Sequence, residues 1–310
     1  MPFERPDIIR PPSEWRSYFL PLTAGCSNNT CTFCNYYGSR LRLRKVEEVL
    51  AEINALALYK QEGLMVSGMP EMVYVIGRQW DGQRVFLQDG DALVYPFPKL
   101  KEVLERLNER FPRLRRVASY ATAGDILRRS PAELRELRDL KLGLLYMGVE
   151  SGDEAVLASI RKGASYREMV EAGRRVKEAG ILLSATVILG LAGVAGSTEH
   201  ALATARILTD IDPDYAGALT LIPVPDTPFF DAVKRGEFEL VTPFRSLEEL
   251  KLIIENTGFT DCFFSSVHAS NYFTVRARLP REKERVVQTL ADIIAREDPS
   301  LLRKEYSRGL

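Results

Sequence analysis

The sequence predicts an α/β protein in which helices cover a parallel sheet. Two observations lead to this fold class: strand-like and helix-like segments alternate along the chain, and most strand segments are continuous apolar runs. Strands buried on both faces read in this way, whereas half-exposed strands alternate apolar and polar residues. Because 45% of the 310 residues are hydrophobic, the chain can build one large core or two modest ones. The alternation alone fits both an open doubly wound sheet and most of a barrel.

Six strands are predicted, over 17–23, 84–88, 115–120, 143–150, 181–189 and 215–222. Helical spacing of apolar residues predicts helices between them, over 45–61, 97–111, 130–140, 165–180 and 197–210. Two of these helices carry start signals, because Ser130 with Glu133 completes a capping box and Ser165 with Glu168 repeats the pattern. Residues 62–83 interrupt the alternation with Met, Gly and Pro, which indicates an insertion.

The last part of the chain changes character. Two helices, over about 246–256 and 281–297, flank the stretch DCFFSSVHASNYFTV. We therefore predict a main α/β domain over 1–230, with a lead-in over 1–14, and a C-terminal extension over 231–310.

The net charge and the apolar runs of the sequence speak against several classes of protein. Lys plus Arg and Asp plus Glu both number 42, so no net charge draws the whole molecule to nucleic acid or to an acidic membrane. The N-terminus MPFERPDIIRPPSEW carries charges and prolines where a signal peptide needs an apolar stretch. The longest apolar run, 180–196, is too short and too rich in glycine for a membrane span, and indicates a buried strand followed by a glycine loop. We expect a cytoplasmic protein with no membrane partner, and the charge balance speaks against nucleic acid.

Three of the four cysteines, Cys26, Cys31 and Cys34, lie in the loop GCSNNTCTFCNYYG, directly after the first strand. The carboxyl ends of parallel strands are where α/β folds place their sites, and clustered cysteines in the cytosol more often bind metal than form disulfides. A structural zinc site needs four protein ligands, and neither His200 nor His268 lies nearby in the sequence. Three thiolates leave one metal position open, which a reactive centre requires. This pattern favours an iron–sulfur cluster; zinc, or three incidental buried residues, are the alternatives.

The motif Cys26-x4-Cys31-Thr32-Phe33-Cys34 resembles the cluster loop of radical S-adenosylmethionine (SAM) enzymes, with Phe33 as the aromatic residue before the last cysteine. The usual spacing in that family is x3 then x2, and the extra residue here resembles a variant loop. The resemblance covers about residues 15–230. It implies a partial (βα)6 TIM-type barrel, with the C-terminal extension closing the open side.

The resemblance also implies the chemistry. The three cysteines are expected to hold a [4Fe–4S] cluster whose fourth iron binds SAM. An electron from a flavodoxin- or ferredoxin-type donor then cleaves SAM, and the resulting 5′-deoxyadenosyl radical abstracts hydrogen from a small or medium organic substrate. The other function class that the sequence leaves open is a non-catalytic iron–sulfur or zinc-binding scaffold, or an RNA-binding protein, with a degenerate SAM site.

Contacts to the methionyl part of SAM are implied after the second strand. Gly90 and Asp91 stand where the family commonly shows Gly-Gly-Glu, with Asp89 in place of the first glycine. Gly90 is expected to let backbone carbonyls approach the methionyl ammonium, and Asp91 to supply a carboxylate. A surface turn is the alternative for these residues.

Contacts to ribose and adenine are implied further along. Glu150 ends the fourth strand and Lys162 follows twelve residues later, a spacing similar to that in oxygen-independent coproporphyrinogen oxidases, where such groups contact ribose and the methionyl carboxylate. A surface pair is the alternative, and Arg161 can stand in for Lys162. Ile188 and Gly190, at the end of the fifth strand, are expected at the adenine, together with residues 221–224.

The small number of cysteines excludes some branches of the radical SAM family. Only one cysteine follows the cluster loop, which speaks against branches that need auxiliary clusters and against methylthio transfer. The resemblance therefore favours a single-cluster enzyme, with oxidoreductase or lyase chemistry and anaerobic handling.

The stretch 262–272 is the remaining unusual segment. Its mixture of apolar and polar residues suits a cover for the open side of the barrel that faces substrate. His268 is a candidate acid or base, Asn271 a candidate substrate contact, and Cys262 or Tyr272 a candidate hydrogen donor. A strand with a satisfied buried histidine is the alternative.

Overall fold

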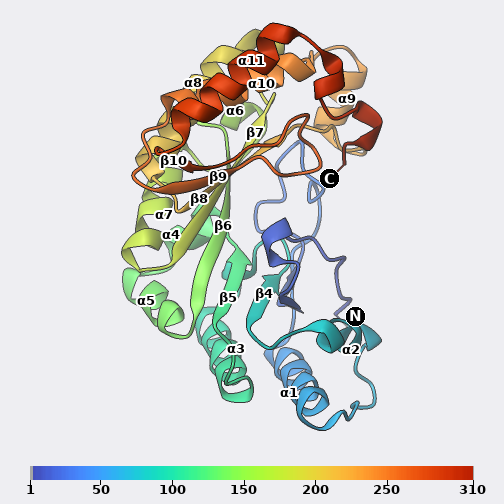
Figure 1. Cartoon of the computed structure of the whole chain (residues 1–310). Helices are drawn as coiled ribbons and strands as arrows, with labels where there is room; N and C mark the ends of the chain where they lie inside the picture. Colours follow the sequence, from blue (N-terminus) through green and yellow to red (C-terminus); the bar gives the residue numbers. More distant parts are fainter. Residues whose placement is uncertain (1–2, 310) are drawn as a thin grey trace. The chain divides into compact units, whose positions relative to one another are not determined.

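The computed structural model describes residues 3–309 (Figure 1). The chain divides into two compact units. The first unit takes in the chain up to Asn29, together with Gly38–Tyr146 and Arg175–Leu182. The second takes in Thr30–Tyr37, Met147–Arg174 and the chain from Leu183 onward. Both units combine parallel strands with helices, which confirms the predicted α/β class.

Parallel strands in the order β1-β4-β5-β6 form the sheet of the first unit. Their bounds are β1 (Tyr18–Pro21), β4 (Arg84–Gln88), β5 (Arg116–Tyr120) and β6 (Leu142–Glu150). No residue of β1, β4 or β5 is exposed, as expected for strands that are covered on both faces. A short antiparallel ribbon of β2 (Thr23–Ala24) and β3 (Arg42–Leu43) lies apart from this sheet. Strand β6 continues from the first unit into the second.

The helices of the first unit are α1 (Val46–Glu62), α2 (Glu71–Gln79), α3 (Phe97–Arg110), α4 (Ala123–Arg128) and α5 (Pro131–Asp139), with 3₁₀ turns over Pro12–Glu14 and Ala92–Val94. The predicted capping box opens α5: Ser130 Oγ accepts from the Glu133 N–H, and the Glu133 carboxylate accepts from the Ser130 N–H at 2.8 Å. The predicted insertion 62–83 contains α2.

In the second unit, β7 (Leu182–Leu189), β8 (Tyr215–Thr220) and β9 (Cys262–Ser265) run parallel, and β10 (Arg276–Leu279) pairs antiparallel with β9. Its helices are α6 (Glu154–Ser159), α7 (Tyr166–Glu178), which ends in the first unit, α8 (Gly193–Ile211), α9 (Pro228–Lys234), α10 (Pro243–Asn256) and α11 (Lys283–Arg296). Two 3₁₀ turns, Pro299–Leu301 and Glu305–Ser307, follow α11. The chain after residue 230 therefore adds two strands to the helices predicted for it.

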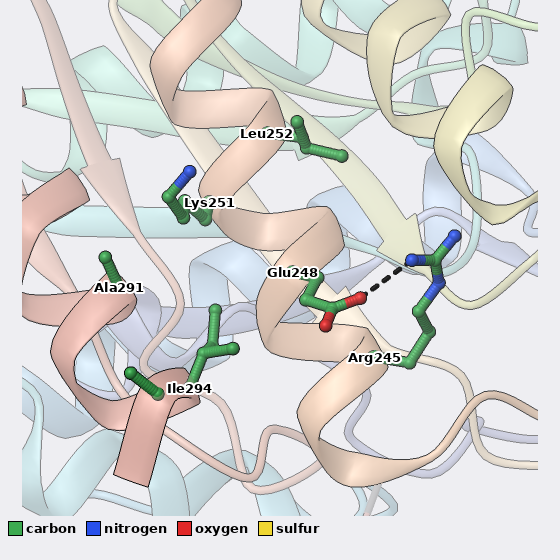
Figure 2. A pocket seen from close by; sticks show the side chains of 7 residues that line it. Arg245, Glu248, Lys251, Leu252, Ala291 and Ile294 are labelled. Atoms are coloured by element: carbon green, nitrogen blue, oxygen red, sulfur yellow. Dashed lines mark hydrogen bonds and ion pairs between the residues drawn. The ribbon is translucent and has the colours of Figure 1, made fainter. Parts of the chain in front are cut away.

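Helix α10 packs against both α8 and α11 (Figure 1). Its buried face includes Leu247, Leu250, Ile253 and Ile254. A hollow of about 340 Å³ remains between α10 and α11, and Figure 2 shows its lining, with Arg245 and Glu248 joined by an ion pair of 2.7 Å. Most of the surface that lines this hollow is apolar, and none of the predicted site residues lies there.

The predicted site segments follow the carboxyl ends of strands in each unit. In the first unit, Gly90 and Asp91 come directly after β4. In the second, β6 ends at Glu150 and Gly190 follows β7. Among the described residues, no helix is both long and apolar enough to cross a membrane.

Candidate functional site

The cysteine loop passes from the first unit into the second. Cys26 belongs to the first unit, where the preceding Gly25 donates its N–H to the Asp89 carboxylate at 3.0 Å. Cys31 and Cys34 belong to the second unit. There the Thr32 N–H donates to the Ile160 carbonyl at 2.9 Å, and the Thr32 carbonyl accepts from the Phe229 N–H at 3.1 Å. Main-chain hydrogen bonds therefore fix this part of the loop without using its sulfur atoms.

The Cys31 thiol is buried, and burial raises its pKa to about 11. The Lys162 ammonium partly opposes this shift, and the Glu150 carboxylate adds to it. Without metal the thiol therefore keeps its proton at neutral pH, and metal binding must release that proton. Thiol donors on a main chain already held in place suit an iron–sulfur cluster, because such clusters are held by cysteine thiolates.

Glu150 and Lys162 form a nearly buried ion pair in the second unit. Lys162 Nζ lies 2.7 Å from Glu150 Oε1, and the two side chains are 14% and 11% exposed. Glu150 has a left-handed backbone with φ of 63°, so its side chain leaves the end of β6 in an unusual direction. A Cβ on Gly148 would stand 2.1 Å from Glu150 Oε1 and 3.0 Å from Lys162 Nζ. The glycine therefore provides the space in which the pair sits.

A buried histidine, His200, is hydrogen-bonded to Ser151, the residue that follows Glu150 at the end of β6. His200 on α8 lies 2.8 Å from Ser151 Oγ through Nδ1 and 3.0 Å from the Ile188 carbonyl through Nε2. Burial lowers the His200 pKa, so the ring is neutral, and the carbonyl partner requires its proton on Nε2. Nδ1 then accepts from Ser151, and the ring links the ends of β6 and β7.

An apolar cluster and a cavity lie at the ends of β7 and β8. Phe33, the predicted cofactor-binding aromatic of the cysteine loop, and Ile188, predicted at the adenine, pack against one buried cluster made of Val156, Ile160, Leu191, Leu221 and Phe229. Gly190 follows Ile188 in the chain with φ of 82° and lines a cavity of about 230 Å³. The other lining residues are Thr220, Leu221, Ile222, Pro223, Leu240, Val241, Tyr272, Glu305 and Arg308.

Of the candidate residues in the stretch 262–272, Tyr272 lines this cavity and the others lie elsewhere. Tyr272 lines the cavity; its hydroxyl donates to Glu305 at 2.7 Å, and the Arg308 guanidinium stacks 4.1 Å from the centre of its ring. Arg308 also donates to the Leu221 carbonyl at 3.0 Å, so the chain after α11 forms part of the cavity wall.

His268 is hydrogen-bonded within its own segment, whereas Asn271 also bonds to β8. The Asn271 amide donates to the Ala218 and Ser266 carbonyls and accepts from the Thr220 hydroxyl, with the side chain buried. His268 is half-buried, and its Nδ1 lies 2.9 Å from Ser270 Oγ. Neither residue lines the cavity beside Gly190, and Asn271 is a structural amide that joins β8 to the segment after β9. A role of either residue toward substrate stays a prediction.

Cys262 lies apart from the residues that line this cavity, and its role as a hydrogen donor stays a prediction. It starts β9, next to Phe263, which pairs with Tyr215 at the start of β8. Five residues of β8 separate Tyr215 from the carboxyl end at Thr220, a rise of about 17 Å. The thiol is fully buried at the amino end of the strands, so it does not lie with the cavity-lining residues.

In the first unit, Asp91 has partners within the protein. Its carboxyl accepts from the Leu93 N–H at 3.0 Å, and Ser27 Oγ lies 2.7 Å from Asp91 and 2.6 Å from Asp125. Burial and the neighbouring Asp125 raise the pKa of Asp91 well above its usual range. The pKa of Asp125 is instead lowered, because the groups that donate to it and Arg128 outweigh its burial. Since the Ser27 hydroxyl has one hydrogen for two carboxyl groups, a protonated Asp91 beside an ionised Asp125 satisfies all three.

This charge assignment predicts an asymmetric response to amide substitution. Asp91→Asn keeps a neutral group of the same shape and is expected to lower the free energy of unfolding by less than about 1 kcal/mol. Asp125→Asn removes the charge that Arg128, Thr122 and Ser27 face, and is expected to cost about 2–3 kcal/mol. Urea unfolding at pH 7 measures both values, and equal losses would contradict the assignment.

Sequence reasoning missed Ser27, Asp125 and His200. Each has an ordinary sequence context. The contacts that tie them together span long stretches of chain, since Ser27 lies 64 residues from Asp91 and 98 from Asp125, and His200 lies 49 from Ser151. The one local signal was Ser27 directly after the first cysteine, which by itself does not indicate a partner.

A family model named Radical SAM superfamily matches residues 20–205, which is more than half of the chain. The chain belongs to the radical SAM superfamily. Enzymes of this superfamily use a [4Fe–4S] cluster and SAM, so the chain's expected cofactors are confirmed at the level of the family. A solved radical SAM structure, coproporphyrinogen III oxidase from Escherichia coli, aligns with a TM-score of 0.53 at 16% identity, over 77% of this chain and 51% of that one. This likeness confirms the partial-barrel fold class.

Two curated relatives of this radical SAM chain are named for methylthio transfer. One, named as a methylthiotransferase, comes from Methanocaldococcus jannaschii and is 23% identical over 75% of this chain and 48% of its own length. The other, a tRNA-2-methylthio-N(6)-dimethylallyladenosine synthase from Janthinobacterium sp. (strain Marseille), is 26% identical over 69% of this chain and 45% of its own. These names differ from the branch that the cysteine count favoured. The chain spans about half the length of both relatives. Their net reaction is therefore not assigned to this chain.

Proposed function

We propose that this radical SAM protein is an enzyme that binds SAM at a [4Fe–4S] cluster and removes a hydrogen atom from a small or medium organic substrate. The observation that carries the proposal is the three-cysteine loop within the family-matched segment, whose Cys31 and Cys34 belong to the same unit as the Glu150–Lys162 ion pair. When bound, the cluster and SAM supply the one-electron chemistry for hydrogen abstraction.

The proposed roles follow the geometry of each unit. Cys26, Cys31 and Cys34 are the cluster ligands. In the second unit, Glu150 accepts hydrogen bonds from the ribose hydroxyls, and Lys162 faces the methionyl carboxylate.

The adenine end of the SAM site is assigned to the cavity after β7. Phe33 and Ile188 supply apolar contact beside it, and Gly190 lets the backbone approach the ring. Tyr272 lines the same cavity and contacts SAM or substrate.

The methionyl ammonium is assigned to the region after β4. Gly90 is half-buried there and leaves its backbone accessible, whereas the carboxyl of Asp91 is already held by Ser27 and Leu93. We therefore assign the contact to the backbone at Gly90, with Asp91 holding the turn. The reaction type, oxidoreductase or lyase, the ferredoxin- or flavodoxin-type donor and the cytoplasmic location remain predictions from the sequence.

Metal analysis and product analysis test the proposal. Protein purified without oxygen is expected to be brown and to contain about four irons and four sulfides per chain. With dithionite and SAM it is expected to release 5′-deoxyadenosine. Cys31→Ala is expected to lose the iron and this product, whereas the matched control Cys262→Ala keeps both, because Cys262 lies at the other end of the strands. One zinc and no iron per chain would contradict the proposal and favour a non-catalytic metal protein.

A further inference from the structure

The carboxylate of Glu249 on α10 lies against the loop that follows β7. Its Oε2 accepts from the Gly190 N–H at 2.6 Å, and its Oε1 accepts from the Ser197 hydroxyl at 2.6 Å. The side chain is fully buried, so water does not compete for these donors. Both oxygens of the carboxylate are therefore committed to residues 190–197, which include the first turn of α8.

The same loop is held from a second side. The Val194 N–H donates to the Glu239 carbonyl at 3.1 Å, and a Cβ on Gly193 would stand 2.9 Å from that carbonyl oxygen. A Cβ on Gly190 would stand 2.7 Å from Val241 Cγ2. Residues 239–249 thus enclose the glycine loop, which we define as residues 190–193, and they leave it little freedom to move.

The glycine loop forms one wall of the cavity. Gly190 lines it, next to Leu240 and Val241 from the enclosing segment. A shift of the Gly190 backbone therefore changes the shape of the cavity directly. Because Gly190 lacks a side chain, its position depends on its backbone hydrogen bonds and on the packing of Val241 against it, and Glu249 is the side chain that accepts its N–H.

We infer that Glu249, which lies outside the family-matched segment, is a positioning residue that fixes the glycine loop and thereby sets the affinity of the cavity for SAM. This inference rests on the proposed function, because it takes the cavity to be the adenine end of the SAM site. Glu249 itself does not line the cavity and acts through Gly190.

Protonation of the carboxyl weakens this arrangement. Burial raises the pKa of Glu249 to about 7, against the opposing effects of Ser197, Gly190 and the positive charge of Arg245. Arg245 also contacts Glu248 and Thr198. The buried His200 on α8 stays neutral because burial lowers its pKa. An ionised Glu249 makes two charge-assisted hydrogen bonds, and a protonated one makes a weaker neutral pair.

The test measures binding of S-adenosylhomocysteine, a SAM analogue without the reactive methyl group, to cluster-loaded protein between pH 6 and 8. The natural chain is expected to bind about three- to tenfold more weakly at pH 6 than at pH 8. Glu249→Gln mimics the protonated acid, so its affinity is expected to stay at the low-pH value throughout. Glu249→Ala leaves the Gly190 N–H without its carboxylate acceptor and is expected to bind at least tenfold more weakly at pH 8.

Leu250→Ala is the matched control, because it removes a buried side chain from the same helix and leaves the carboxylate in place. It is expected to lower stability and to keep both the affinity and its pH dependence. If Glu249→Ala does not fold, the pH profile of Glu249→Gln decides the question. A Glu249→Gln profile identical to that of the natural chain would overturn the inference alone. Failure of the natural, iron-loaded chain to bind the analogue at any pH would overturn the proposed SAM site and the inference with it.

Discussion

Gly148→Ala is expected to weaken binding of SAM or its analogue by about 10- to 100-fold while the protein stays folded. The new Cβ would stand 2.1 Å from Glu150 Oε1, so this carboxylate must move away from Lys162. The clash involves the tip of a side chain and not the backbone, so rotation of Glu150 relieves it. Losing one or two charge-assisted contacts of about 1.5–3 kcal/mol accounts for the expected change. Titration of cluster-loaded protein with S-adenosylhomocysteine measures it.

A double-mutant cycle sharpens this prediction. If Gly148→Ala acts by displacing Glu150, it is expected to have almost no further effect in a Glu150→Ala background. Gly143→Ala is the control on the same strand, because the nearest atom to its Cβ belongs to the stem of Arg116, at 3.1 Å, and it is expected to keep the affinity. Unchanged affinity in Gly148→Ala, with iron content preserved, would show that the Glu150–Lys162 pair lies outside the SAM site.

The free energy of unfolding is expected to fall by about 3 kcal/mol between pH 5 and pH 8 through the titration of Glu249 alone. Its pKa in the folded protein is about 7, against a usual value of 4.5. Between these values the folded chain keeps a proton that the unfolded chain has released, so stability falls as pH rises and the loss is complete above pH 7. The carboxylate that holds the glycine loop most tightly is thus the form that costs stability, a trade-off common at functional positions.

Urea unfolding of the natural chain and of Glu249→Gln at several pH values measures this contribution. The two proteins are expected to be similar near pH 5, and the Gln variant is expected to be the more stable one at pH 8. The difference between the two curves isolates Glu249 from the other titrating groups. Parallel curves would mean that Glu249 does not titrate in this range.

Elements with a strong local pattern were predicted closely from the sequence. The strand over 84–88 coincides with β4, and the capping box at Ser130 places the start of α5 correctly. The helix predicted from 197 begins earlier, at Gly193, because two glycines in the first turn resemble a loop. Strands β9 and β10 have four residues each, so they are too short for a period of two to stand out.

Only those residues of the candidate site that belong to a sequence motif could be predicted. The cysteines were found from their spacing, and Glu150 and Lys162 from a resemblance that also gave their order along the chain. The supporting groups Glu249 and His200 contact partners 59 and 49 residues away, and no local pattern encodes such a separation. Buried polar groups of this kind become visible only when the fold brings their partners together.

Cys262 offers the protein a chemical reporter of its own unfolding. Its thiol is fully buried in β9, which lies between β8 and β10, so an alkylating reagent reaches it only when these strands separate. The other three cysteines are the proposed cluster ligands, and a bound cluster shields their sulfur from the same reagent. In iron-loaded protein, the mass gained at Cys262 after a short pulse of reagent therefore counts opening events of the second unit. Opening rates can then be compared with and without SAM, with no engineered probe site in the chain.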